Sequence, residues 1–146
     1  MSATGIDVFD KSLQVTNIWL NEIMEEHGPD RQRAWHILNA VLRAIRDQLP
    51  VDLAAHLGAQ LPLLVRGAFY EQFEPSRLPD KTRTLQEFLH HIEDGMGGAR
   101  PVNPEDAMQS VFHVLSHYLD PGQIRKVRQA LPEDIRRLWP DPDVRH

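Results

Sequence analysis

A short segment that the chain contains twice constrains the fold more than any other feature of the sequence. Residues 60–69 read QLPLLVRGAF, and residues 129–139 read QALPEDIRRLW. At an offset of 70 positions the matched pairs are Leu61 with Leu131, Pro62 with Pro132, Val65 with Ile135, Arg66 with Arg136, and Phe69 with Trp139. Leu49 with Leu119 and Leu57 with Val127 extend the match upstream. Self-similarity of this kind predicts an internal repeat, whose two copies bury faces that neither copy covers alone.

Hydrophobic periodicity predicts an all-α fold. Apolar residues recur at spacings of three to four, and no run shows the period-two alternation of a half-buried strand. Asp30 and Asn103 are suited to capping long helices, while Arg43 and Arg46 lie off the apolar stripe of their helix. We expect a bundle of about eight helices, built from two tandem, pseudo-twofold-related repeats that share one core. The expected helices span residues 7–26, 30–48, 51–57, 62–73, 85–94, 103–119, 122–129 and 131–139.

The expected organisation is a single domain over residues 1–146. Repeat 1 covers about residues 7–74, a proline-containing linker about 75–83, and repeat 2 about 84–140, with a disordered tail at 141–146. Gly58 is expected to end the third helix, and Gly95–Pro101 is expected to form a loop.

Composition excludes several classes of function. The chain has no cysteine, which removes disulfides, thiolate catalysis and cysteine-ligated zinc, and which fits a cytoplasmic location. The net charge is −5, so nucleic-acid binding is disfavoured. The first residues do not form a secretory signal, and no uncharged apolar run is long enough for a membrane span.

The repeated motif has two interpretations. In the structural one, the proline sets the first helical turn, and the apolar residue and the aromatic residue four positions later share one face. The arginine stem packs beside that face, and its guanidinium reaches a carboxylate or a helix C-terminus. In the functional one, the two arginines form paired anion-binding points. We favour the structural interpretation, in which the motif residues are Leu61, Pro62, Arg66, Phe69, Leu131, Pro132, Arg136 and Trp139.

This LPxxxRxxF/W pattern, the Asp- or Asn-initiated long helix before it and the chain length resemble the bacterial family named domain of unknown function 2267. The resemblance runs from about Phe9 to Pro140. It implies an all-α, pseudo-twofold bundle in a bacterial cytoplasm, and it implies no activity.

Histidines are the candidates for chemistry. His113 and His117 lie four apart, which places two imidazoles on one helical face, and His90 lies on the preceding helix. We expect His113 to be half-buried and His90 and His117 to face solvent. There is no HExxH motif, no second Glu-x-x-His, and no G-x-S-x-G serine. These histidines are therefore weak metal candidates, and we expect no cofactor and no catalytic residue.

Packing explains the residues that recur in the two copies, and the sequence contains no recognisable catalytic group of residues. We therefore favour a non-enzymatic helical interaction or scaffold module. Its partner would be another protein or a second copy of the chain. Trp19, Trp35 and Trp139 are of a type enriched at interfaces, although Trp139 is expected to fill the core. The alternative is a metal- or small-molecule-binding helical protein that uses the histidine cluster.

Overall fold

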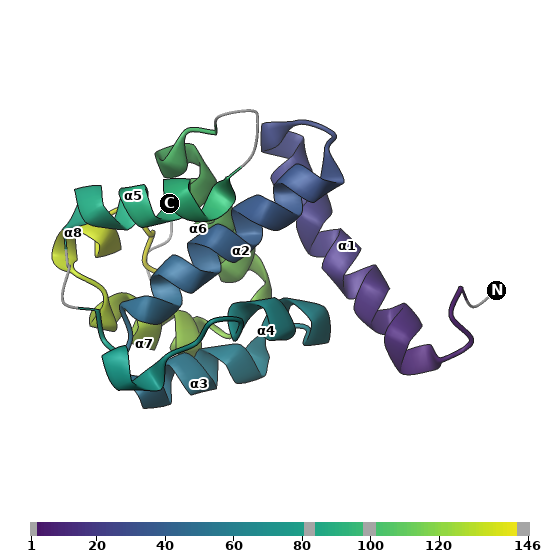
Figure 1. The fold of residues 1–146 in the computed structure, drawn as a ribbon, viewed down its shortest axis with the longest axis horizontal. Coiled ribbons are helices and arrows are strands. Elements are labelled where there is room, and N and C mark those ends of the chain that lie inside the picture. The colour runs from purple at the N-terminus through teal and green to yellow at the C-terminus, as the bar shows by residue number, and fades with distance from the viewer. Residues whose placement is uncertain (1–2, 81–83, 98–101, 143–146) are drawn as a thin grey trace.

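The computed structural model describes residues 3–80, 84–97 and 102–142. Within these ranges the chain forms eight α-helices and one 3₁₀ helix, with no strand, as the periodicity predicted. The elements are α1 (Asp7–His27), α2 (Arg31–Asp47), α3 (Val51–Gln60), α4 (Leu63–Phe69), η1 (Pro75–Arg77), α5 (Leu85–Met96), α6 (Pro104–Tyr118), α7 (Pro121–Ala130) and α8 (Glu133–Arg136) (Figure 1). No helix in these ranges has the length and apolar character needed to cross a membrane.

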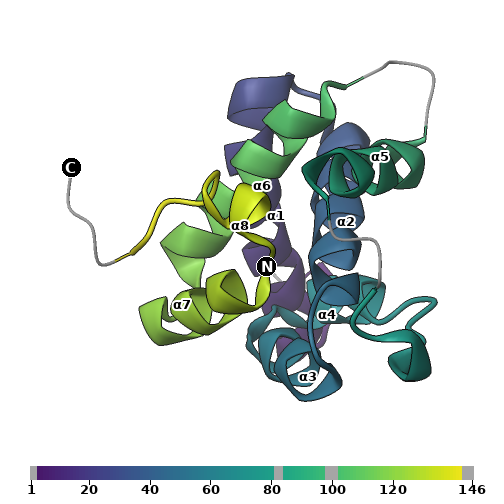
Figure 2. The ribbon, with the colours of Figure 1, turned by 90° about the vertical axis from the view of Figure 1, so that its left-hand side faces the viewer.

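Helix α2 is the centre of the bundle. It contacts α1, α4, α5 and α6, and its stripe of Ile37, Leu38, Val41, Leu42 and Ile45 is completely buried. Helices α1 and α5 also both pack on α6. Figure 2 shows α7 and α8 beside α6, on the side away from α2, and the Leu85 N–H at the start of α5 donates to Asp134 of α8 at 3.0 Å. Since α3 also contacts α7, the short helices join the two sides of the bundle at one end.

Local capping explains where the helices begin. The Asp30 carboxylate accepts the Arg33 N–H at 3.2 Å, and the Asn103 side chain accepts the N–H groups of Glu105 and Asp106 at 2.8 and 3.2 Å. These side chains satisfy N–H groups that the first helical turn leaves without a partner. The predicted starts of α2 and α6 are confirmed.

The predicted helix ends were less accurate. Gly58 does not end α3 but lies buried within it, because the Tyr70 ring occupies the space where a side chain would stand. Gly95 is likewise inside α5, where an added Cβ would lie 3.2 Å from the Ala40 Cβ. Both glycines allow close approach of a neighbouring element rather than a chain turn.

The remaining differences fall in the short helices and connections. Helix α4 ends at Phe69, four residues before its predicted end, and α8 ends at Arg136 rather than near residue 139. The predicted linker contains the 3₁₀ helix η1, and residues 81–83 lie outside the described residues. The predicted disordered tail also lies mostly outside them, since only 141 and 142 are described.

Candidate functional site

The two motif arginines bind backbone carbonyls at the end of the preceding helix. Arg66 Nε donates to Gly58 O at 2.9 Å, and its Nη2 donates to Ala59 O at 3.0 Å and Leu61 O at 2.9 Å. Each guanidinium thus binds three carbonyls at the end of a helix, one of which also accepts the backbone N–H of the residue that caps that helix. Arg136 makes the corresponding contacts with Arg128 O at 3.0 Å, Gln129 O at 3.4 Å and Leu131 O at 2.9 Å.

Burial follows the same correspondence. Leu61 and Leu131, Val65 and Ile135, and Phe69 and Trp139 are each at most 1% exposed. Both prolines and both arginines are half-buried. The motif therefore places its apolar residues in the core and its arginines at the edge of it.

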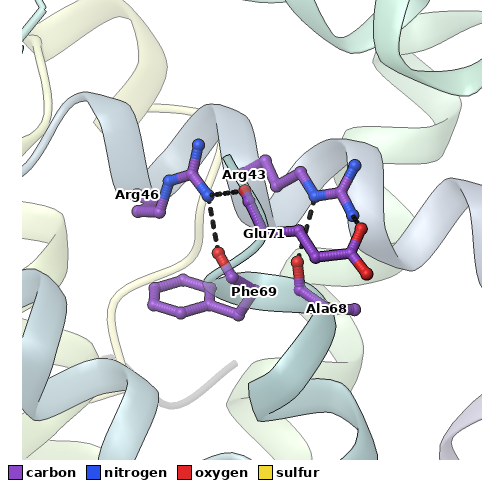
Figure 3. Close-up of polar contacts among 5 residues, drawn as sticks. All are labelled: Arg43, Arg46, Ala68, Phe69 and Glu71. Atoms are coloured by element: carbon purple, nitrogen blue, oxygen red, sulfur yellow. Dashed lines mark hydrogen bonds and ion pairs between the residues drawn. The ribbon is translucent and has the colours of Figure 1, made fainter. Parts of the chain in front are cut away.

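A pair of arginines from α2 binds the last residues of α4 and the residue Glu71 beyond it (Figure 3). Arg46 Nη1 donates to Phe69 O at 2.6 Å and to Glu71 O at 2.8 Å, and its Nε pairs with Asp47 at 2.8 Å. Arg43 donates to Ala68 O at 3.1 Å and pairs with the Glu71 carboxylate at 2.8 Å. The sequence placed Arg46 off the apolar stripe, but its side chain is buried, because its acceptors come from a segment more than twenty residues later.

The end of α8 is held differently. Arg128, on α7, donates through Nε to Trp139 O at 2.7 Å and through Nη2 to Arg136 O at 3.4 Å. The Trp139 ring stacks on Phe112 with centroids 4.4 Å apart, and its Nε1–H donates to Ser116 Oγ at 2.8 Å. Trp139 is therefore a core residue with a satisfied polar atom.

The candidate histidines do not form a cluster. His90 pairs with Asp94 along its own helix at 3.3 Å, and His117 pairs with Glu22 of α1 at 2.6 Å. His113 is exposed and not half-buried as predicted, because its neighbours Phe112 and Val114 take the core positions. In the described part of the chain, no three His, Asp or Glu side chains are arranged to hold a metal ion.

A polar seam joins α1 to the end of α6. Glu22 Oε1 accepts from Tyr118 Oη at 2.6 Å and lies 2.6 Å from His117 Nδ1. The hydrogen bond to Glu22, with a smaller effect of burial, raises the pKa of Tyr118 to about 12. Trp19 stacks on Tyr118 with centroids 5.5 Å apart, so aromatic contact and hydrogen bonding act together.

One turn further along the same seam, Ser110 lies between Glu26 and His27. Ser110 Oγ donates to a Glu26 carboxylate oxygen and lies 2.7 Å from His27 Nε2. A hydrolytic serine would give its proton to the histidine, whereas this hydroxyl gives its proton to the carboxylate. Ser110 is also only 3% exposed, so the arrangement supports helix packing and offers no accessible nucleophile. The sequence spacing gave no indication of this contact between α1 and α6.

Comparison with known proteins identifies the family. A family profile described as "Uncharacterized conserved protein (DUF2267)" matches residues 16–138. The chain belongs to the DUF2267 family. The resemblance drawn from the repeated motif is thereby confirmed, and a comparison with curated proteins finds no match.

The DUF2267 segment includes both copies of the motif except for Trp139, and it begins part-way along α1. Residues 7–15 of α1 precede it, and Figure 1 shows these turns reaching away from the other helices. Large apolar side chains are exposed there and at the start of α4, namely Ile6, Val8, Phe9, Leu13, Leu63 and Leu64. We call these six residues the α1–α4 surface. The sequence placed Val8, Phe9 and Leu13 on the apolar stripe of the first helix but could not show that the stripe is uncovered.

Proposed function

We propose that this chain is a non-enzymatic helical interaction or scaffold module, which binds another protein or a second copy of itself. The α1–α4 surface carries the proposal, because six large, half-exposed apolar side chains on and beside two helices that contact each other are typical of an interaction site. The polar clusters of the described residues have structural partners instead: carbonyl groups, helix caps and the seam between α1 and α6.

We also propose that the two halves are tandem copies of one helical unit related by a pseudo-twofold arrangement and sharing one core. The matched contacts of Arg66 and Arg136 support this origin, since each donor and each acceptor is displaced by 70 positions. The crossed packing supports it too. Helix α1 lies against α2 and α6, and α5 lies against the same two helices. A cytoplasmic location stays a prediction from the cysteine-free sequence.

Metal or small-molecule binding through His90, His113 and His117 is the alternative, and the geometry favours it less. Two of the three side chains are paired with carboxylates on different elements, and the third is exposed without a ligand set around it. Elemental analysis of purified protein tests it directly. Stoichiometric metal that is lost in a His113→Ala, His117→Ala double variant would favour this alternative over an interaction module.

Sedimentation velocity over a wide concentration range, combined with affinity capture from the native host, tests the proposed function. We expect either a concentration-dependent increase in mass or the specific retention of one partner in defined stoichiometry. A protein that stays monomeric throughout and retains nothing above a bead control would contradict the proposal.

A further inference from the structure

The N-terminal part of α1 continues the apolar face of the helix beyond the bundle. With 100° between successive residues, Phe9 and Leu13 lie in line with Thr16, Leu20 and Ile23, which are all buried. Helix α1 has 21 residues and α5, which packs on the same two helices, has 12. Residues 7–15 also precede the DUF2267 segment. This extension therefore presents a core-type stripe that no element of the described chain covers.

A groove lies beside this stripe. It runs between α1 and the start of α4, has a volume of about 360 Å³, and is lined by apolar side chains that include Val15, Trp19, Leu61 and Leu63. Val8 also lines it, so the extension contributes to the groove wall. Phe9 and Leu13 lie about a third of a turn further around α1, where they form an exposed apolar ridge. The N-terminal end of α1 thus carries both a wall of the groove and a separate ridge.

The N-terminal end of the extension is held in a helical conformation by local hydrogen bonds. The N–H and the hydroxyl of Thr4 donate to Asp10 Oδ1 at 3.0 and 2.8 Å, which folds the preceding residues back onto the helix. Binding through an ordered helix costs less conformational entropy than binding through a flexible segment.

The apolar area available is about three-quarters of what a standard dimer interface buries. The six residues of the α1–α4 surface are between 41% and 56% exposed. If a large side chain has a full area of about 200 Å², they present about 600 Å² per copy, before the groove walls are added. A standard interface buries about 800 Å² per partner.

We propose that this chain forms a twofold-symmetric dimer, in which Phe9 and Leu13 of one copy pack into the groove between α1 and α4 of the other. Because the end of α1 carries both the ridge and a wall of the groove, a twofold axis lets each copy cover the ridge of the other, and the contact occurs twice and closes. A single unrelated helix would fill the groove but leave the ridge in water. The inference rests on the proposed interaction function and specifies its partner and its surface.

Sedimentation velocity on the full chain tests the dimer, with a double variant and a matched control. Phe9→Asp with Leu13→Asp places two charges on the ridge at positions already half-exposed, so folding should be unaffected, as circular dichroism will check. Val51→Asp is the control, because Val51 is 37% exposed at the start of α3 and does not line the groove. We expect a wild-type dimer, an unchanged dimer for Val51→Asp, and a dissociation constant at least about 100-fold weaker for the double variant.

Disulfide trapping tests the ridge-to-groove contact itself, since the chain has no cysteine of its own. A mixture of Phe9→Cys and Leu63→Cys copies under mild oxidant should give the mixed dimer. A mixture of Val51→Cys and Leu63→Cys copies should give much less. Equal yields from the two mixtures would contradict the proposed contact.

The outcomes separate this inference from the function on which it rests. A wild type that dimerises equally well with the charged ridge overturns the surface and leaves self-association standing. A wild type that stays monomeric but retains one defined partner overturns the dimer and leaves the interaction module standing. A monomer that retains nothing overturns both.

Discussion

Replacing Arg66 or Arg136 by alanine should destabilise the protein by similar amounts. Each guanidinium donates three hydrogen bonds to the carbonyls where one helix ends and the next begins. Loss of the side chain leaves the carbonyls of Gly58 and Arg128 with a backbone donor each, and leaves the other contacted carbonyls to water where water can reach them. The stem of each arginine also covers apolar surface, which the substitution exposes.

The expected cost is about 2 kcal/mol for each variant. Hydrogen bonds from a charged group contribute about 1.5–3 kcal/mol when buried, but both arginines are half-buried, so water recovers part of the loss. For a chain of this size, about 2 kcal/mol corresponds to a fall in Tm of about 4–8 °C. Lysine at either position should recover about half of the lost stability, because it keeps the positive charge but lacks the planar guanidinium whose N–H donors reach several carbonyls at once.

Urea denaturation followed by circular dichroism measures these changes, and Arg137→Ala is the matched control. Arg137 follows Arg136 in the chain but makes only an exposed ion pair with Glu133 at 3.6 Å. Such pairs contribute at most about 1 kcal/mol and commonly much less, so this variant should unfold close to wild type.

Two results would refute the reasoning. Losses below about 0.5 kcal/mol for both alanine variants would show that the carbonyl contacts contribute little, since surface substitutions alone reach that size. An unchanged stability together with weakened binding of inorganic phosphate would instead support the interpretation of the two arginines as paired anion-binding points.

Arg46→Ala should cost about 3 kcal/mol in urea denaturation, because its buried guanidinium donates to one carbonyl at the end of α4 and to another just after it. Gly58→Ala should cost about 1–3 kcal/mol in the same assay, since the new Cβ would lie 2.4 Å from a phenol oxygen, whereas Gly67→Ala meets nothing within 4 Å and should gain about 0.5–1 kcal/mol. The raised pKa of Tyr118 means that its neutral form stabilises the fold fully below the ordinary value of 10.0 and that this contribution is lost as the pH rises through about 12. Tyrosinate absorbance should therefore show the ionisation of Tyr118 near pH 12, and this transition should move to lower pH in Glu22→Ala.

The sequence predicted those features that depend on neighbours along the chain. The caps at Asp30 and Asn103 set the starts of α2 and α6, because their acceptor oxygens bind N–H groups two or three residues later. The apolar stripe of α2 was also predicted, since helical periodicity alone places those residues on one face.

Features that depend on distant residues were missed. A glycine such as Gly58 is typical of a helix end, yet here it leaves room for the Tyr70 ring, twelve positions later. An arginine off the apolar stripe, such as Arg46, is typically exposed to solvent, yet its side chain is buried and donates to the carbonyls of Phe69 and Glu71. The contact of Ser110 with Glu26 and His27 joins α1 to α6 over more than eighty residues, and no local pattern encodes it.

The two motif copies also show how the same structural need is met by different side chains. The carbonyls of Phe69 and Trp139 correspond in the motif, and each accepts from an arginine, but Arg46 comes from α2 and Arg128 comes from α7. Arg128 corresponds to Gly58 in the other copy, where an arginine side chain could not fit because Tyr70 fills that space. On the duplication that we propose, the ring in one copy and the arginine in the other are alternative ways to fill the corner between two short helices. In the copy where the Tyr70 ring fills the corner, no arginine from the neighbouring short helix can reach the Phe69 carbonyl, so a donor must come from another helix. This explains why α2 carries a buried arginine, Arg46, while α6 carries none.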